Sequence, residues 1–212
     1  MTFQFKIQIK NIKKPPVWRR IVVPAKISFE LFHEIIQEAF GWMEIHMYSF
    51  SPGGYGTEPW IEKNDEEGDY PIFKDSLSAT TTLLSDIFKA EGDTFTYIYD
   101  YGDDWIHKIT LEKIDRLNIA LSAKLLDGKG ICPPEDCGGP WGYEHLKKVI
   151  TDKNHPEFQD YKNWIIGDEK LMEFYDDDEP LWDPNDFDLE FEKHWFDSTY
   201  KIIDLEMYKK DE

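Results

Sequence analysis

The sequence predicts a single α+β domain with a mostly antiparallel sheet: an N-terminal strand pair, then a helix, a central hairpin with the sequence YDYGDDW, and a helical C-terminal part. Residues 3–9 alternate between apolar and polar side chains, which is the period of a half-buried strand. Residues 29–40 place apolar side chains on one helical stripe. The predicted strands and helices do not alternate regularly, which favours α+β over a doubly wound parallel sheet.

The first helix has recognisable signals at both ends. A second strand at 17–24 precedes it, separated from the first strand by the prolines of NIKKPP, which cannot donate to a strand ladder. Ser28 is a suitable N-cap for the helix, and Gly41 is suited to end it in a left-handed conformation. These signals predict an antiparallel strand pair with a longish connection, followed by a helix.

The later elements follow from the same reasoning, and residues 116–126 fit either a helix or a strand. We expect one domain over residues 1–190 and a helical extension at 191–212 packed on it. The predicted elements are a strand at 45–50, a short helix at 81–88 capped by Thr81 or Thr82, the hairpin within 95–114, helices at 143–150 and 156–165, and a closing helix at 189–210.

The net charge of the chain restricts the classes of partner that it is expected to bind. The net charge is −19, from 43 acidic and 24 basic residues, and such a field disfavours nucleic acid as a partner. The N-terminus does not resemble a signal peptide, no apolar run is long enough to span a membrane, and two cysteines do not make a disulfide framework. These features predict a cytoplasmic protein. One small basic group is interpreted as a solvated hairpin tip: Lys10, Lys13, Lys14, Arg19 and Arg20.

The central hairpin suggests a site. A turn of two or four residues would place Asp100 opposite Trp105 and make Asp100 a diagonal neighbour of His107. A carboxylate beside an imidazole suits a general base with its orienting group, or a metal ligand, with His46 as the third residue. The alternatives are a structural hydrogen bond, or an odd-numbered loop that separates the pair. The candidate ligand-binding cleft is His46, Tyr99, Asp100, Asp103, Asp104, Trp105, His107, Trp141 and Tyr143.

The segment CPPEDC is the other candidate. Cys132 and Cys137 have a spacing that zinc permits, although they could equally be small buried apolar residues. Zinc would need further ligands such as His107, His145 or His155, and no other cofactor is expected. Glu135 and Asp136 could be ligands or could bond backbone amides within the loop.

A helix is expected to start at the sequence GGPWG that follows. Pro140 suits its first turn, and the amides near 141–143 would then be unpaired donors. We expect the carboxylate of Asp103 or Asp104 to dock there, which would join the hairpin turn to this loop.

Several motifs in order resemble the plasmid pRiA4b ORF-3-like family: VWRRIVVP, LFHEIIQEAFGW, HMYSF, YIYDYGDDWIHKITLEKI, CPPEDCGGPWGYEHL and FDLEF. The resemblance covers residues 1–190 and implies a small α+β fold, with a plasmid or mobile-element context in some relatives and no known reaction. This chain departs from the pattern at Tyr48, where relatives often have a second histidine, and at Leu125, where many have a cysteine. If the family site binds metal, these changes imply weakened binding here.

Three functions are compatible with the sequence. The first is a non-enzymatic binding module whose aromatic and acidic surface holds a protein or peptide partner. The alternative is a metal-assisted or acid–base hydrolase-type enzyme that uses His46, Asp100 and His107. The second alternative is a nucleic-acid accessory protein of a mobile element. No membrane association is expected, and the oligomeric state is open.

Overall fold

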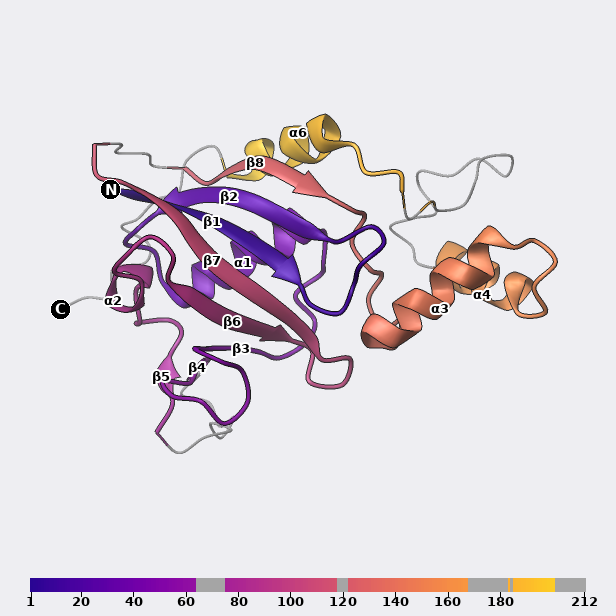
Figure 1. The fold of residues 1–212 in the computed structure, drawn as a ribbon, viewed down its shortest axis with the longest axis horizontal. Coiled ribbons are helices and arrows are strands. Elements are labelled where there is room, and N and C mark those ends of the chain that lie inside the picture. The colour runs from indigo at the N-terminus through magenta and orange to yellow at the C-terminus, as the bar shows by residue number, and fades with distance from the viewer. Residues whose placement is uncertain (64–74, 118–121, 168–182, 184, 201–212) are drawn as a thin grey trace.

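The computed structural model describes residues 1–63, 75–117, 122–167, 183 and 185–200 (Figure 1). An eight-stranded sheet with the order β5-β4-β3-β6-β7-β1-β2-β8 forms its centre, and helix α1 lies against one face. Among the described strands, β4 and β5 are the one parallel pair. The predicted α+β class with a mostly antiparallel sheet is confirmed. None of the described helices has the length and apolarity that crossing a bilayer requires.

The elements begin and end as follows. The strands are β1 (Thr2–Ile9), β2 (Trp18–Pro24), β3 (Tyr48–Ser51), β4 (Ile61–Glu62), β5 (Leu77–Ser78), β6 (Thr94–Tyr99), β7 (Trp105–Asp115) and β8 (Lys124–Lys129). The helices are α1 (Phe29–Phe40), α2 (Leu84–Ile87), α3 (Gly139–Thr151), α4 (Phe158–Ile166) and α6 (Leu189–Thr199).

The N-terminal strand pair and its helix form as the sequence indicates. β1 and β2 are antiparallel, and the apolar residues of β1 face α1. The side-chain oxygen of Ser28 accepts the Leu31 N–H, and Gly41 ends α1 with φ 86°. A ring cluster including Phe5, Phe32 and Phe88 fills the space between helix and sheet. Burial of these rings dominates the packing energy of this layer.

Several predicted boundaries shift. β3 begins at Tyr48 rather than at residue 45. Neither Thr81 nor Thr82 caps α2, because that helix begins only after Leu83. The ambiguous 116–126 segment ends in β8, and its residues 118–121 lie outside the described residues. The closing helix is described as far as Thr199. Of the predicted extension at 191–212, residues 191–200 are described and residues 201–212 lie outside the described residues.

Arg19 is a correction to the predicted basic tip. Odd-numbered residues of β2 face the core, so its guanidinium is buried rather than solvated. It donates to the carbonyl oxygens of Ala39 at 2.8 Å and Gly130 at 2.9 Å. Phe187, just before α6, stacks on it at 4.3 Å. Arg19 therefore joins β2, α1 and the chain that follows β8.

The register of the central hairpin is the main correction. β6 and β7 pair Tyr99 with Trp105 and Tyr97 with His107, so the loop has the odd length of residues 100–104. Asp100 and Asp104 adopt positive φ angles of 55° and 54°, and the Asp104 N–H donates to the Asp100 carbonyl at 2.7 Å. His107 consequently faces the core, fully buried. The predicted diagonal pair of Asp100 and His107 is therefore wrong.

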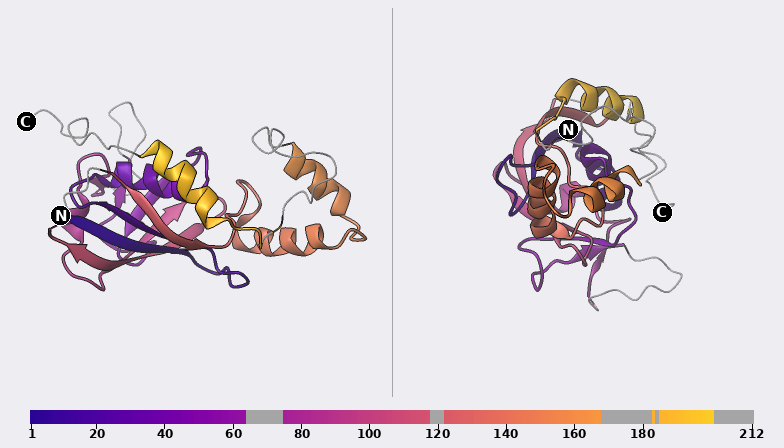
Figure 2. Two further views of the ribbon diagram at one scale, coloured as in Figure 1. Left: turned by 90° about the horizontal axis from the view of Figure 1, so that it is seen from above. Right: turned by 90° about the vertical axis from the view of Figure 1, so that its right-hand side faces the viewer.

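Helices α3 and α4 extend past one end of the sheet, and α6 lies along β8 (Figure 2). The loop of residues 131–138 connects β8 to α3, so it passes the same end of the sheet as the β6–β7 turn. That end is where the candidate site forms.

Candidate functional site

Three segments meet at this end of the sheet: the chain before β3, the β6–β7 turn and the loop 131–138. The pairing of Tyr48 with Tyr99 brings the chain before β3 beside the turn, and the Asp100 N–H donates to the Met47 carbonyl at 2.9 Å. The Trp42 indole N–H donates to the Pro133 carbonyl at 2.9 Å, which holds the loop against the end of α1. Long-range pairing thus positions residues that are far apart in sequence.

A histidine lies among three carboxylates at this junction. His46 Nε2 is 3.3 Å from Asp136 Oδ1 and 3.7 Å from Asp100 Oδ2, and these three ligand atoms all lie within 4.8 Å of one another. Glu135 Oε2 is 3.9 Å from the same nitrogen. We call His46, Asp100, Glu135 and Asp136 the His46 cluster.

Each of the two buried carboxylates is fixed through one oxygen. Glu135 Oε1 accepts hydrogen bonds of 3.0 Å from the Met43 N–H and the Tyr99 hydroxyl. Asp100 Oδ1 accepts the Gly102 N–H at 2.8 Å. The second oxygen of each is left to face the imidazole. Such outer contacts are how proteins orient ligand side chains before a ligand arrives.

The His46 cluster has three carboxyl groups and one imidazole, so its negative charge is not balanced. The Glu135 side chain is 7% exposed, and burial raises the pKa of its carboxyl group above the usual range, against the opposing effects of the Met43 N–H and Tyr99. Burial, with Glu135 close by, also raises the pKa of the Tyr99 phenol, so Tyr99 stays a donor. His46 Nε2 and Glu135 Oε2 are both buried without a hydrogen-bond partner among the described residues. Such atoms are costly unless something pairs with them.

Backbone strain is concentrated around the cluster. Glu44, Asp100 and Asp136 have left-handed φ angles of 59°, 55° and 56°. For residues other than glycine this conformation is uncommon and costs on the order of 1 kcal/mol each. Aspartate tolerates it better than most residues, which suits the two carboxylates that point at His46.

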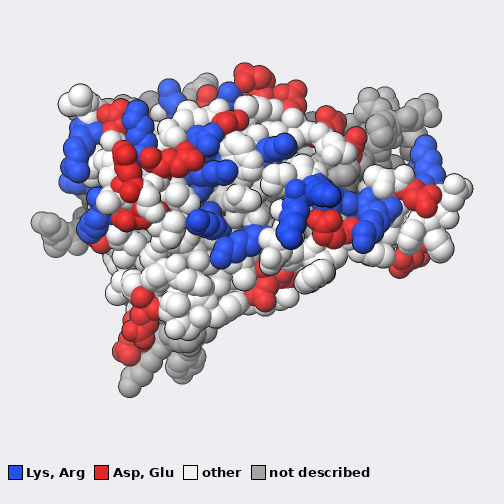
Figure 3. Space-filling view, in the orientation of Figure 1, with Lys and Arg blue, Asp and Glu red and all other residues white. Residues whose placement is uncertain are grey.

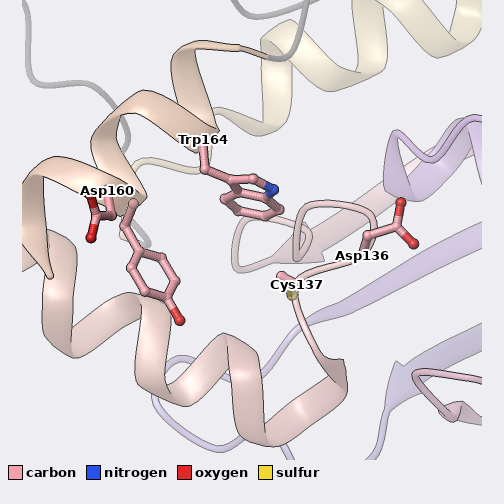
Figure 4. A pocket seen from close by; sticks show the side chains of 5 residues that line it. Asp136, Cys137, Asp160 and Trp164 are labelled. Carbon is pink, nitrogen blue, oxygen red and sulfur yellow. The ribbon is translucent and has the colours of Figure 1, made fainter.

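A cleft of about 290 Å³ lies beside the cluster, between α4 and the loop 131–138. Figure 4 shows Trp164 and Cys137 reaching toward the same space, while the Asp136 carboxylate turns away from it. Because Asp136 belongs to both, the cleft gives the cluster a neighbouring space open to small molecules. Its described lining residues are Asp136, Cys137, Asp160, Tyr161 and Trp164.

Neither cysteine is part of the His46 cluster, although Cys137 lines the neighbouring cleft. Cys132 and Cys137 are free thiols, and burial raises the pKa of both, which keeps them neutral. His145 and His155 both lie near Glu157 instead, with His145 Nε2 3.1 Å from its carboxylate. In the part of the chain that the structure describes, the cluster of His46, Asp100 and Asp136 is the one group of potential ligands at metal-binding distances.

The predicted cleft residues fall into three groups. His46, Tyr99 and Asp100 take part in the cluster, as above. Trp105 and His107 lie in the core. The others have separate roles: Asp103 Oδ2 accepts the Gly138 N–H at 3.0 Å, Asp104 accepts the Tyr55 hydroxyl at 2.5 Å, Tyr143 is buried and donates to the Ile131 carbonyl, and Trp141 is 85% exposed.

The docking of Asp103 joins the hairpin turn to the start of α3 as expected, through the amide of the N-cap residue rather than those of residues 141–143. The predicted cleft lacks Glu135 and Asp136, although this acidic pair of the CPPEDC loop is a possible ligand pair in the sequence. The Glu135 side-chain oxygen binds the Met43 amide, outside its own loop. The spacing of acids within the loop was the only signal for it in the sequence.

Comparison with known proteins supports the resemblance. A family model described as plasmid pRiA4b ORF-3-like protein matches residues 1–191. The uncharacterized protein y4hQ of Sinorhizobium fredii is 34% identical over 163 residues, which cover 76% of this chain and 79% of that protein. The crystal structure of MM3350, a protein of unknown function from Methanosarcina mazei Go1, is similar with a TM-score of 0.70 and 30% identity, over 90% of this chain and 96% of that chain. Neither name assigns an activity.

Proposed function

The chain belongs to the plasmid pRiA4b ORF-3-like family, and on the geometry of the His46 cluster we propose that it binds a divalent metal ion. The observation that carries the proposal is the convergence of three carboxylates on an imidazole nitrogen that has no hydrogen-bond partner among the described residues. A dication would offset the excess negative charge and would also bind the buried lone pairs that have no hydrogen-bond partner.

The distances suit a metal ion. Ligand bonds of about 2.1 Å separate neighbouring ligand atoms by about 3.0 Å in octahedral and about 3.4 Å in tetrahedral geometry. The separations of 3.3 Å and 3.7 Å from His46 Nε2 to Asp136 and Asp100 are close to these values. One imidazole nitrogen with carboxylate oxygens favours zinc or manganese over magnesium and calcium, which prefer oxygen alone.

The departures of this chain from the family pattern do not remove these ligands. Tyr48 stacks on His33 with ring centroids 3.6 Å apart, and Leu125 is buried in the core. Neither belongs to the His46 cluster. The weakened binding that those changes implied therefore does not apply to a site built from His46, Asp100 and Asp136.

A second function, metal-assisted hydrolysis, is favoured by Glu135. His46, Asp100 and Asp136 would hold the ion, and a bound dication would supply hydrolytic chemistry by lowering the pKa of water at its remaining positions. Glu135 Oε2 lies 3.9 Å from His46 Nε2 and is held by its other oxygen, so it is placed to accept the proton.

Isothermal titration calorimetry tests the metal site, with metal ions added to protein that was purified without a histidine tag and stripped with EDTA. We expect one Zn²⁺ or Mn²⁺ per chain, bound more tightly than Mg²⁺. Asp100→Asn and His46→Ala should each weaken binding at least about 100-fold, beyond the loss typical of outer-shell changes.

Asp103→Asn is the matched control. It lies in the same turn, and its amide oxygen can still accept the Gly138 N–H, so metal affinity should stay within about twofold of wild type. Equal affinity in wild type and Asp100→Asn, or no binding at millimolar metal, would overturn the proposal. Metal binding without any hydrolytic activity would instead favour the non-enzymatic binding module. For its location we propose a reducing cytoplasm, which suits two free thiols.

A further inference from the structure

The negative charge of the chain is unevenly distributed. Segments 64–74, 168–182 and 201–212 together hold fifteen acidic and five basic residues, so ten of the nineteen net negative charges are in them. On the sheet face opposite α1, lysine and arginine side chains gather in a band across the middle and over the β1–β2 turn and α3 (Figure 3). The local field there differs from the one that the total charge suggests.

Strand parity builds this band. Even-numbered residues of β1 and β7 point away from α1, so Lys6 and Lys108 stand on the open face, with Lys10 just beyond the end of β1. Arg20 is opposite Lys6 but is neutralised by Glu112 and Asp127, each at 2.7 Å. We call Lys6, Lys10, Lys13, Lys14 and Lys108 the lysine face; within the described residues none of them forms an ion pair.

An aromatic cleft lies at one end of the lysine face. It has a volume of about 350 Å³ and is formed where the β1–β2 turn meets the start of α3. Trp141 is 85% exposed there, beside Lys13 and Lys14. An indole so exposed on a stable helix contributes nothing to the core, and it offers a flat ring next to two cations. The described lining is Asn11, Lys13, Lys14, Pro140, Trp141 and Glu144.

We propose that the lysine face binds single-stranded nucleic acid, with phosphates along the lysines and a base stacked on Trp141. A groove or face of cations beside an exposed aromatic ring is the arrangement that holds such strands without reading their sequence. An acidic peptide would satisfy the lysines and leave the ring unused. Duplex DNA keeps its bases stacked inside, so it would also leave Trp141 unused. The proposal does not depend on the metal site.

The size of the effect follows from the charges. Five lysines that replace counterions on a single strand give a slope of about −3.5 for log affinity against log salt. Affinity should therefore fall about 100-fold between 50 and 200 mM salt. Binding is therefore expected at the lower salt, against the opposing negative field of the rest of the chain.

Fluorescence anisotropy of the full chain with labelled 12-nucleotide oligothymidine and oligouridine tests the proposal at 50 mM salt. We expect both strands to bind, and hairpin duplex DNA of the same length to bind at least tenfold more weakly. Lys13→Glu combined with Lys14→Glu, or Lys108→Glu alone, should weaken binding more than tenfold and flatten the salt slope by about 0.7 per lysine. Trp141→Ala should weaken binding about 5- to 100-fold and leave the slope unchanged.

Lys89→Glu is the control, because it makes the same charge change next to α2, where Lys89 donates to the Ser85 carbonyl. It should leave affinity within about threefold of wild type. The proposal is overturned if wild type does not bind either strand, if Lys89→Glu is as damaging as the lysine-face variants, or if duplex binds as tightly as single strands. Wild-type affinity in Trp141→Ala, with polyglutamate competing as well as oligothymidine, would instead identify an acidic protein partner.

Discussion

His107 illustrates how burial fixes a protonation state. It lies against Phe40 and Trp42, its Nδ1–H donates to the Trp105 carbonyl at 2.8 Å, and burial lowers its pKa to about 3. In the unfolded chain the pKa is about 6.5. The neutral form therefore contributes stability above pH 6.5, and that contribution is lost as pH falls, by about 1.4 kcal/mol per pH unit.

The prediction is that His107→Gln makes the free energy of unfolding less sensitive to acid. Urea titrations between pH 7 and 4.5 should show the difference between wild type and variant shrinking by about 1.4 kcal/mol per unit below pH 6.5. His194→Gln, on the exposed side of α6, should run parallel to wild type. Parallel profiles for His107→Gln would show that the buried histidine is not kept neutral.

At the scale of single residues, the sequence predicted only part of the His46 cluster, because two of its members lie in an irregular loop. His46 and Asp100 could be predicted because each stands at the end of a recognisable strand, where pairing brings them together. Glu135 and Asp136 lie in an irregular loop, whose path is set by contacts such as that of Trp42 with Pro133. No periodicity predicts such a contact, so their meeting with His46 could not be derived.

Among the elements, the β6–β7 hairpin shows that an odd or even loop length decides which side chains of the two strands share a face. The expected turn, either residues 102–103 or residues 101–104, has an even length, but the observed loop spans the five residues 100–104, with left-handed φ at Asp100 and Asp104. One residue more turns every later side chain of β7 to the opposite face. In the observed register His107 faces the core, while Lys108 faces the open side of the sheet and is part of the lysine face.

Helix α3 gives a prediction in which replacing a helical glycine by alanine lowers the free energy of unfolding. Gly142 lies inside the helix, where alanine normally stabilises by about 1 kcal/mol. A methyl group at this position would collide with the Cys137 backbone carbonyl. We therefore expect Gly142→Ala to lower the free energy of unfolding by about 1–3 kcal/mol, as overpacking does, and to weaken metal binding by displacing Asp136.

The control for this prediction is Gly53→Ala. There the nearest atom to an added methyl is a side-chain methyl of Thr57 at 3.1 Å, and no loop of the site is touched. Chemical denaturation and metal titration of both variants separate the two positions. A Gly142→Ala protein more stable than wild type, with unchanged metal affinity, would show that the 131–138 loop does not depend on its contact with α3.

For the whole molecule, composition predicted the amount of charge but not its placement. Acidic residues are numerous in segments such as 168–182, whereas the period-2 pattern that makes β1 amphipathic also puts its lysines on one face. Hydrophobic periodicity therefore determines both the core and the position of the cations, because the apolar residues face α1 and the polar ones face away. This pattern was enough to predict the fold class, whereas the positions of the charged side chains depend on the strand register.

The last prediction concerns whether α6 is part of the domain. Phe196 is 1% exposed, α6 packs on β8, and Thr199 bonds the Glu38 carboxylate of α1 at 3.1 Å. Phe196→Ala should lower the free energy of unfolding by about 3 kcal/mol, in a single transition, because a large buried ring is lost from the common core. Phe191→Ala on the same helix removes a ring that is 54% exposed and should cost less than about 0.5 kcal/mol.

Urea unfolding followed by both tryptophan fluorescence and far-UV circular dichroism makes this measurement. If α6 were an independent extension, Phe196→Ala would leave the main transition in place and add a separate loss of helix at low urea. Coincident transitions with a lower midpoint would instead place α6 in the cooperative unit. Arg19 supplies the reason to expect cooperation, since its buried guanidinium contacts α1, the chain after β8 and the Phe187 ring just before α6.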